Sequence, residues 1–212
     1  KLGTVETVVN YNENRNITNF KKIKYNNKNL PFEEIRFSSD SSLLGGVMFE
    51  YYENGLLKKQ TDYDENATVT VMQEYVRSND TIYVNVYDGK GVFVYRNIML
   101  TETVSGTSLI KAMYKVDRNN NILETTILEY DQLLSLRRKM IYDDKNQGTK
   151  REFVYDDEGA LLRSVTYNEN NEIISDSSYE YDKYGNVIRI IEFDKETSST
   201  KLYFINYLSK RD

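Results

Sequence analysis

Hydrophobic and polar residues alternate with a period of two along most of the chain, which is the pattern of β-strands. Near the end of the chain, Ser177, Tyr179 and Tyr181 fall on one side of the alternation, and Glu180 falls on the other. Earlier in the chain, Tyr83 is set against Val84 in the same way. We therefore expect an all-β protein.

Tyrosine marks an internal repeat of about 12 residues. The chain holds 19 tyrosines, 8 phenylalanines and no tryptophan. Within three runs, at residues 11–25, 51–87 and 130–193, aromatic residues recur at intervals of 12 to 14 residues, and most are followed directly by Asp or Asn. The members of this series are Tyr11, Tyr25, Tyr51, Tyr63, Tyr75, Tyr87, Tyr130, Tyr142, Tyr155, Tyr167, Tyr181 and Phe193.

A residue that tolerates positive φ often stands four positions after the repeat aromatic, or after Val116 in the case of Asn120. These residues are Gly55, Gly91, Gly159, Gly185, Asn29, Asn120 and Asn171. An Asp or Asn side chain can accept backbone N–H bonds at the start of a type I turn, and the Gly or Asn then takes the left-handed position. The pattern predicts a short hairpin turn in each repeat.

The repeat predicts a long antiparallel meander of β-hairpins, with about 12 residues in each strand-and-turn unit. Strands of about 7–8 residues joined by short turns give roughly 14–17 strands over the whole chain. Open sheets of this size usually curl, split or close. We therefore expect a strongly curved or spiralling sheet with the larger aromatic residues on its concave or covered face.

We expect a single domain over residues 1–212 with two irregular segments. Residues 31–48 contain Pro31, a serine-rich stretch and Gly45-Gly46, and they predict an irregular loop. Residues 89–113 contain three glycines around a more apolar strand, and they predict an insertion or a seam between subsheets. Residues 133–142 also fit a helix, but the flanking repeats favour a strand.

Composition excludes much common catalytic machinery. The 212 residues include no histidine and no cysteine, which excludes His-based triads, thiolate nucleophiles and Cys/His metal sites. The formal net charge of -5 argues against a nucleic-acid partner, and the basic run 137–139 is typical of a solvated strand face. No apolar stretch is long enough to cross a bilayer.

Two segments resemble a known repeat family. Residues 181–189 (Tyr-Asp-Lys-Tyr-Gly-Asn-Val-Ile-Arg) and 155–163 (Tyr-Asp-Asp-Glu-Gly-Ala-Leu-Leu-Arg) resemble the YD-repeat family, which is related to the Rhs-type repeats of bacterial secreted and surface proteins. The resemblance covers residues 130–194 well. Residues 52–58 are similar to the Tyr-x-x-Gly-x-Leu repeats of MORN-like bacterial proteins, which is our second choice. Either resemblance implies an exported bacterial protein built of β-hairpin repeats.

Carboxylates offer one enzymatic hypothesis, because two of them held about 5–10 Å apart can hydrolyse a glycosidic bond. The candidates are Asp143-Asp144 and Asp156-Asp157-Glu158. The alternative is that Asp143 and Asp156 cap turns while their neighbours point to water, and we favour it. Acids also precede the repeat aromatics, as at Glu50 and Asp62, and we expect them all on the sheet face opposite the aromatics, as a solvated surface.

We therefore expect a non-enzymatic exported protein whose sheet provides a binding or structural surface for a protein or glycan at the cell envelope. The alternative is a carboxylate-dependent glycan hydrolase. Most tyrosines are expected to pack across strands, which leaves Tyr52 and Tyr184, in or beside turns, as ligand-binding candidates. We expect no cofactor, no metal and no nucleic acid, and a homodimer through edge strands is plausible.

Location follows from the resemblance, which implies a periplasmic protein, an outer-membrane lipoprotein or another cell-surface protein. The sequence begins at Lys1 without a methionine or a signal-peptide pattern. We therefore expect a processed or trimmed form of the chain.

Overall fold

The computed structural model describes residues 4–143 and 149–205, which form β-strands and turns without a helix. The strands are β1 (Val5–Tyr11), β2 (Ile17–Tyr25), β3 (Pro31–Ser38), β4 (Leu43–Tyr51), β5 (Leu57–Tyr63), β6 (Val69–Ser78), β7 (Thr81–Asp88), β8 (Phe93–Val104), β9 (Thr107–Val116), β10 (Ile122–Tyr130), β11 (Leu136–Asp143), β12 (Thr149–Tyr155), β13 (Leu161–Tyr167), β14 (Ile173–Tyr181), β15 (Val187–Asp194) and β16 (Ser199–Phe204). In these ranges there is no helix long and apolar enough to span a membrane.

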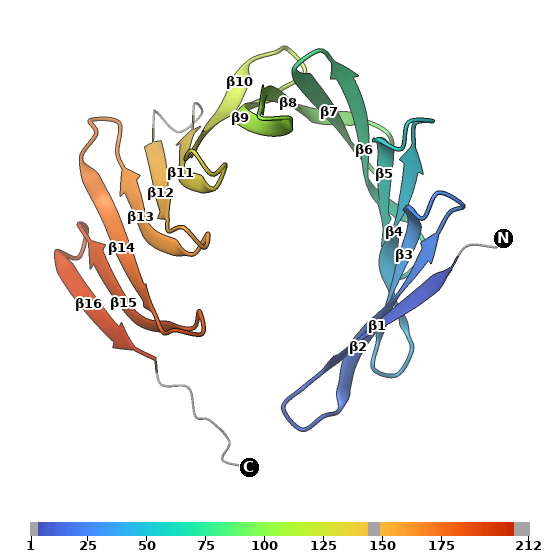
Figure 1. Cartoon of the computed structure of the whole chain (residues 1–212), viewed down its shortest axis with the longest axis horizontal. Coiled ribbons are helices and arrows are strands. Elements are labelled where there is room, and N and C mark those ends of the chain that lie inside the picture. Colours follow the sequence, from blue (N-terminus) through green and yellow to red (C-terminus); the bar gives the residue numbers. More distant parts are fainter. Residues whose placement is uncertain (1–3, 144–148, 206–212) are drawn as a thin grey trace. The chain divides into compact units, whose positions relative to one another are not determined.

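The sixteen strands follow one another in the sheet in the order of the sequence, each antiparallel to the next (Figure 1). The all-β fold, the hairpin meander and the expected number of strands are therefore confirmed. Residues 136–143 form β11, so the strand interpretation of this segment is correct and the helical alternative is wrong.

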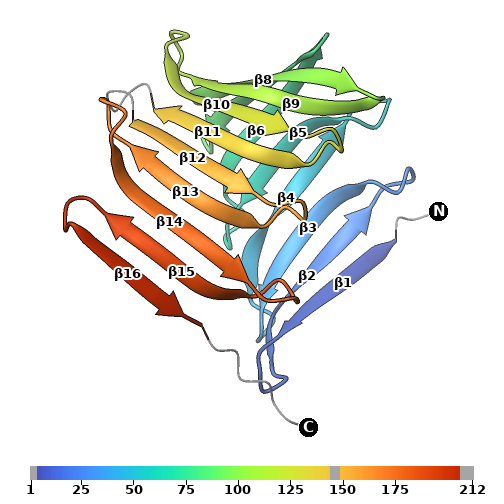
Figure 2. The ribbon, with the colours of Figure 1, turned by 60° about the vertical axis from the view of Figure 1, so that its left-hand side comes forward.

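The chain divides into two compact units. The first comprises residues 1–98 and 117–119, and the second comprises residues 99–116 and 120–212. Within each unit every described strand contacts only its neighbours in sequence, as β11 to β16 show in Figure 2. Each unit is therefore a single layer of sheet. Buried side chains in the described ranges are few: Thr61, Val84, Val86, Ala112, Val116, Thr126, Met140, Ile141 and Val165.

A common hairpin turn joins most of these strands. In the turn after β14, the N–H of Asp182 donates to the carbonyl of Asn186 (2.9 Å), and the N–H of Gly185 donates to the carbonyl of Asp182 (3.0 Å). The Asp182 side chain accepts from the N–H groups of Tyr184 (2.8 Å) and Asn186 (3.0 Å). The same pair of side-chain bonds is made by Asn12, Asn26, Asp64, Asp88, Asp131 and Asn168.

The positive-φ positions confirm the predicted turns. All seven expected residues have φ between 58° and 86°: Gly55, Gly91, Gly159, Gly185, Asn29, Asn120 and Asn171. The same conformation also occurs at Arg15 (61°), Ala67 (58°) and Leu134 (65°), which the sequence did not indicate. These three residues carry a Cβ that disfavours the left-handed region, so the surrounding hairpins impose the turn there.

The aromatic residues at strand ends do not share one face, so the expectation of a single aromatic face is wrong. In the first unit Tyr63 pairs with Gly46. Gly46 lies an odd number of residues from Tyr51 along β4, so the two tyrosines point to opposite faces. The β-bulge between Glu50 and Tyr51 sets this register.

The second unit repeats the alternation. Tyr142 and Tyr167 both pair with Lys150 and share one face. Tyr130 and Tyr181 lie on the other face, as the registers of β10 to β14 show. From β10 to β15, the aromatics at the ends of even-numbered and odd-numbered strands therefore lie on opposite faces.

The acids that precede the aromatics alternate as well. Glu50 and Glu74 both pair with Lys59 and share a face, whereas Asp62 pairs with Val47 on the other face. The expectation that all these acids share one face is therefore wrong, for the same reason of register.

Residues 31–48 are regular rather than irregular, which corrects the predicted loop. They form β3 and most of β4, joined by a turn in which the N–H of Ser41 donates to the carbonyl of Ser38 (3.1 Å). Gly46 is required by packing, because a Cβ there would collide with the backbone carbonyl oxygen of Glu34 and with the Tyr63 hydroxyl. The glycines therefore serve close packing in a strand.

Residues 89–113 are also mostly strand. They include β8 and the start of β9, which are joined by Ser105 (φ 51°) and Gly106 (φ 81°). Two consecutive positive-φ residues are typical of the two-residue hairpin loop. The boundary between the two units falls within β8.

Candidate functional site

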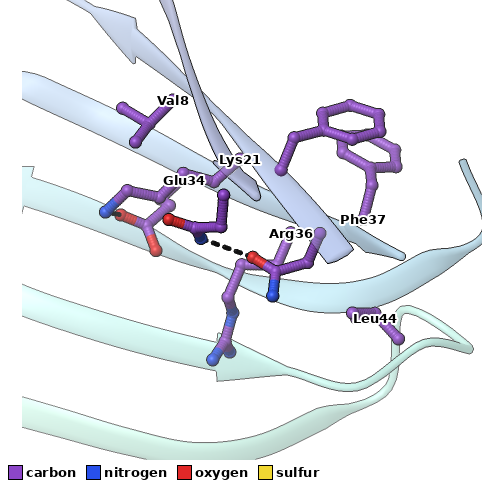
Figure 3. Close-up of a pocket in the computed structure, with 9 residues that line it drawn as sticks. Val8, Lys21, Glu34, Arg36, Phe37 and Leu44 are labelled. Atoms are coloured by element: carbon purple, nitrogen blue, oxygen red, sulfur yellow. Dashed lines mark hydrogen bonds and ion pairs between the residues drawn. The ribbon is translucent and has the colours of Figure 1, made fainter. Parts of the chain in front are cut away.

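A hollow of about 570 Å³ lies over the first three strands of the first unit. Strand pairing sets Val8 beside Lys21 and Lys21 beside Arg36, and one step along the strands it sets Asn10 beside Asn19. These side chains therefore share one face of β1, β2 and β3. The hollow is also lined by Phe20, Glu34, Phe37 and Leu44 (Figure 3).

Four of the polar side chains in the hollow are paired with one another. Lys21 Nζ lies 2.9 Å from Glu34 Oε2, and Asn10 Nδ2 donates to Asn19 Oδ1 at 2.5 Å. Asn10 Oδ1 and Asn19 Nδ2 have no partner among the described residues. The amide pair therefore still offers an acceptor and a donor to a ligand.

Arg36 differs from these side chains because its guanidinium is uncommitted. It makes no hydrogen bond or ion pair with any residue in the described part of the chain, and in Figure 3 it extends without a dashed line. The residue opposite on β4 is Gly45, which has no side chain to cover it. The guanidinium is exposed and open to a ligand.

Apolar groups complete the hollow. Phe20 is adjacent to Lys21 and Phe37 is adjacent to Arg36, so their rings, which stack with centroids 4.9 Å apart, point to the opposite face of the sheet. The apolar side chains on the face of Arg36 are Val8 and Leu44. Leu44 is half exposed, at 50%, and Val8 lies at the other side of the lining in Figure 3. The hollow therefore combines one free cation, one amide pair and apolar surface.

The second unit carries a contrasting charged face on β11 to β15. Arg138 Nε donates to Glu152 Oε1 (2.7 Å), and Arg163 donates to both carboxylate oxygens of Asp176 (2.9 and 2.5 Å). On β15 a further arginine donates to a glutamate of β14 at 2.7 Å. The arginines of this face are therefore neutralised across strands.

Glu152 is the most enclosed carboxylate of that face, with its side chain only 12% exposed. The guanidinium of Arg138, and then Lys150, hold the pKa of Glu152 below its usual value against the opposing effect of burial. Tyr167 Oη donates to the same carboxylate at 3.4 Å. This cluster has no unpaired charge, so it acts as a cross-strand tie.

Tyr52, one of the two tyrosines predicted as ligand-binding residues, is 37% exposed and occupies the first position of the turn after β4. Its hydroxyl donates to the carbonyl of Tyr75 at 2.8 Å. The hydroxyl is therefore engaged with the backbone, while part of the ring is open to solvent.

Tyr184, the second predicted tyrosine, is 76% exposed in the turn after β14. Lys183 Nζ lies 4.9 Å from the centroid of its ring. Tyr52 belongs to the first unit and Tyr184 to the second. Their role in binding stays a prediction.

The repeat tyrosines serve mainly as structure. Tyr51, Tyr130 and Tyr181 donate their hydroxyl hydrogens to the backbone carbonyls of residues 31, 110 and 161, at 2.7, 3.0 and 2.8 Å. Each bond spans 20 residues of sequence and ties the end of one strand to the preceding strand. Burial raises the pKa of all three hydroxyls.

The carboxylates that suggested a hydrolase have structural contacts. Asp156 caps its turn by accepting from the N–H of Ala160 at 2.7 Å, and Asp157 forms an ion pair with Arg137. Asp143 ends β11 and Asp144 lies outside the described residues. Across the described ranges, no group of three or more acidic side chains could hold a metal ion.

The sequence did not indicate the hollow. Lys21, Glu34 and Arg36 occur in an ordinary alternation of charged and apolar residues. Only the registers of β1, β2 and β3 bring them together with Asn10 and Asn19. No local motif could have identified them.

Comparisons with known proteins give only distant matches. No protein-family model matches the sequence, and no curated protein matches it significantly. A chain of the Photorhabdus luminescens Tc holotoxin pore is 14% identical, with 95% of this chain and 11% of that chain covered and a TM-score of 0.43. A TcdB2-TccC3 structure without its hypervariable C-terminal region is 12% identical, with 87% and 12% covered and a TM-score of 0.38.

A third solved structure has a similar length. It is a porin-like protein from Bacteroides uniformis, which is 10% identical, with 95% of this chain and 89% of that chain covered and a TM-score of 0.42. The chain spans only 11% and 12% of the two toxin chains. Likeness at these TM-scores assigns no function to the chain.

Proposed function

We propose that this chain is a non-enzymatic, exported repeat protein whose sheet faces act as a binding or structural surface at the bacterial cell envelope, with a protein or a glycan as partner. The observation that carries the proposal is the use made of its charged groups. The turn aspartates cap backbone N–H groups and many strand carboxylates pair with cations, while the open hollow over β1 to β3 keeps an uncommitted arginine.

The two sheet faces suit such a role. Aromatic residues lie on both faces of each unit, most of them half-buried, with charged side chains between them. A Tyr ring offers apolar area and a hydroxyl at low entropic cost, which suits sugar rings and protein interfaces. A single-layer sheet leaves both faces accessible to partners.

A thermal-shift and glycan-array screen, with and without calcium, tests the proposal. A ligand that binds the native state must raise its apparent stability, so we expect one glycan class to raise the melting temperature reproducibly. If no glycan binds, pull-down from an envelope extract tests a protein partner. Absence of any saturable partner in both experiments would contradict a binding role.

Asp156→Asn separates this proposal from a glycan hydrolase. A binding surface retains its ligand affinity and loses at most about 1 kcal/mol of stability through the weakened turn cap. A hydrolase would instead stay folded and lose turnover of its glycan. Release of reducing sugar by wild-type protein, abolished by this substitution, would overturn the non-enzymatic assignment.

Self-association through edge strands belongs to the same proposal. Strands β1 and β16 each have one neighbour in the described sheet, and Phe204 on β16 is 70% exposed. Unpaired strand edges can add a further strand. Light scattering after size exclusion should give a dimer mass, and a monomer mass at all concentrations would contradict this part.

A further inference from the structure

We propose that the hollow over β1 to β3 binds an acidic sugar, with Arg36 holding the carboxylate of that sugar. This inference rests on the proposed binding function and names a ligand class and a site for it. It follows from the free cation, the amide pair and the apolar lining, each of which matches one part of such a ligand.

The charge of the hollow selects an anion. Lys21 and Glu34 neutralise each other at 2.9 Å, so the guanidinium of Arg36 gives the lining a net positive charge. A planar guanidinium can donate two parallel hydrogen bonds to a carboxylate, and this geometry is more specific than that of an ammonium group. The second unit shows the same geometry between Arg163 and Asp176, at 2.9 and 2.5 Å.

The amide pair matches sugar hydroxyls. A hydroxyl both donates and accepts, and Asn10 Oδ1 with Asn19 Nδ2 offers an acceptor beside a donor. The apolar lining from Val8 and Leu44 can contact the C–H groups of a pyranose ring. The volume of about 570 Å³ exceeds what a lone carboxylate needs and falls within the range of small-ligand pockets.

A peptide fits the hollow less well. Extended peptides bind mainly through main-chain hydrogen bonds at a free strand edge. Here the ligand would lie on the face of the sheet, where the backbone groups of β2 are paired with β1 on one side and β3 on the other. Recognition must therefore come from side chains, and the side chains present suit a polyhydroxylated acid.

Two matched ligands and two matched variants test the inference. The ligands are α-1,4-linked digalacturonate and its neutral counterpart galactobiose, which differ at the carboxylates. The variants are Arg36→Ala and Arg77→Ala; Arg77 is a second exposed arginine of the first unit without a hydrogen bond or ion pair to any described residue. Isothermal titration calorimetry measures each combination.

We expect wild-type protein to bind digalacturonate about tenfold or more tightly than galactobiose, because the charge-assisted bonds to Arg36 form only with the acid. Arg36→Ala should remove that difference, Arg36→Lys should restore part of it, and Arg77→Ala should leave it unchanged. Both alanine variants replace exposed side chains, and circular dichroism should confirm that their melting temperatures match wild type.

Three results would overturn the inference: equal affinity for the two sugars, digalacturonate binding that survives Arg36→Ala, and no binding of digalacturonate by folded wild-type protein. In each of these cases the envelope-surface proposal is judged separately by the glycan array and the pull-down. Binding of an acidic peptide through Arg36 in place of the sugar would also overturn the assignment of ligand class.

Discussion

Two charged faces, built from the same strand-and-turn unit, use arginine in opposite ways. On β11 to β15 of the second unit, Arg138 and Arg163 each donate to a carboxylate on a neighbouring strand. On β1 to β3 of the first unit, Arg36 has no such partner among the described residues and lines a hollow. The difference separates a structural tie from a group that is free to bind.

The comparison also shows how a single-layer sheet is stabilised. Without a second layer, no continuous apolar core forms, and the described units bury few side chains fully. Cross-strand pairs, each contributing about 0.2–1 kcal/mol, then supply much of the stability. An arginine left out of this pairing is informative about binding where, as at Arg36, it also lines a hollow.

The largest expected effect is on the free energy of unfolding. It tests whether the hairpins of both units depend on the same positive-φ turn. Gly55→Val in the first unit and Gly185→Val in the second should each lower the free energy of unfolding by about 2 kcal/mol or more, because φ is 84° and 82° and a β-branched residue is strained there. Urea unfolding monitored by circular dichroism measures both. Unchanged stability in both variants would refute the turn assignment.

Gly185→Asn is the matched control for the turn. Asn29 and Asn171 adopt φ of 62° and 58° at the equivalent position in their own turns. Asparagine tolerates the left-handed region better than other residues with a Cβ. This variant should therefore lose less than about 1 kcal/mol, and a loss as large as that of valine would point to steric crowding rather than to φ.

The second prediction compares one carboxylate from each of the two charged faces, Glu152 in the second unit and Glu34 in the first. Glu152→Ala should cost about 2 kcal/mol, because it leaves Arg138 and Lys150 without their enclosed acceptor. Glu34→Ala should cost about 0.5 kcal/mol, because its partner Lys21 is 37% exposed and can be solvated. Hydrogen exchange of β11 to β13 and of β1 to β3 locates each loss, and equal losses would remove the distinction between the two faces.

A third, smaller effect should be the same in both units. Tyr51→Phe and Tyr181→Phe each remove one hydroxyl bond to a backbone carbonyl, at 2.7 and 2.8 Å, and keep the ring. Each should lower the unfolding free energy by about 1 kcal/mol. Tyr184→Phe is the control, because that tyrosine is 76% exposed, and it should change stability little. A loss of stability in only one of the Tyr51 and Tyr181 variants would show that this hydroxyl bond contributes to stability in one unit and not in the other.

Local features of the fold could be predicted from the sequence, because the turn chemistry is contained within five consecutive residues. Asp182 and Gly185 specify their own hairpin by side-chain acceptance and positive φ. Leu134 and Ala67 could not be predicted at the same position, since neither residue type favours it. There the neighbouring strands impose the turn that the residue itself disfavours.

The faces and the hollow could not be predicted, because both depend on register. The bulge residue in the β4–β5 hairpin decides whether Tyr63 and Tyr51 lie on the same face of the sheet or on opposite faces. Arg36 becomes a candidate binding residue only when three strands align it with Lys21 and place Gly45 opposite. The periodicity that revealed the repeat contains no information on these alignments.

The last prediction uses pH to weaken the structural tie without removing any atom. Arg138 and Lys150 hold the pKa of Glu152 below its usual value, so the folded state favours the ionised carboxylate more than the unfolded state does. The stabilisation is fully present above the unfolded pKa, about 4.3, and is lost as pH falls through the lower folded value. We therefore expect the unfolding free energy to decline on acidification, with the contribution of Glu152 localised by hydrogen exchange to β11 to β13.

Glu152→Gln tests the origin of that decline, because glutamine keeps the length and cannot ionise. The variant should be less stable than wild type at pH 7, and the two should converge as the wild-type carboxylate becomes protonated. Arg36→Gln should leave the acid dependence unchanged, because that guanidinium has no carboxylate partner among the described residues. If Glu152→Gln retains the full wild-type acid dependence, the enclosed carboxylate is not the tie, and the contrast between the two faces loses its electrostatic basis.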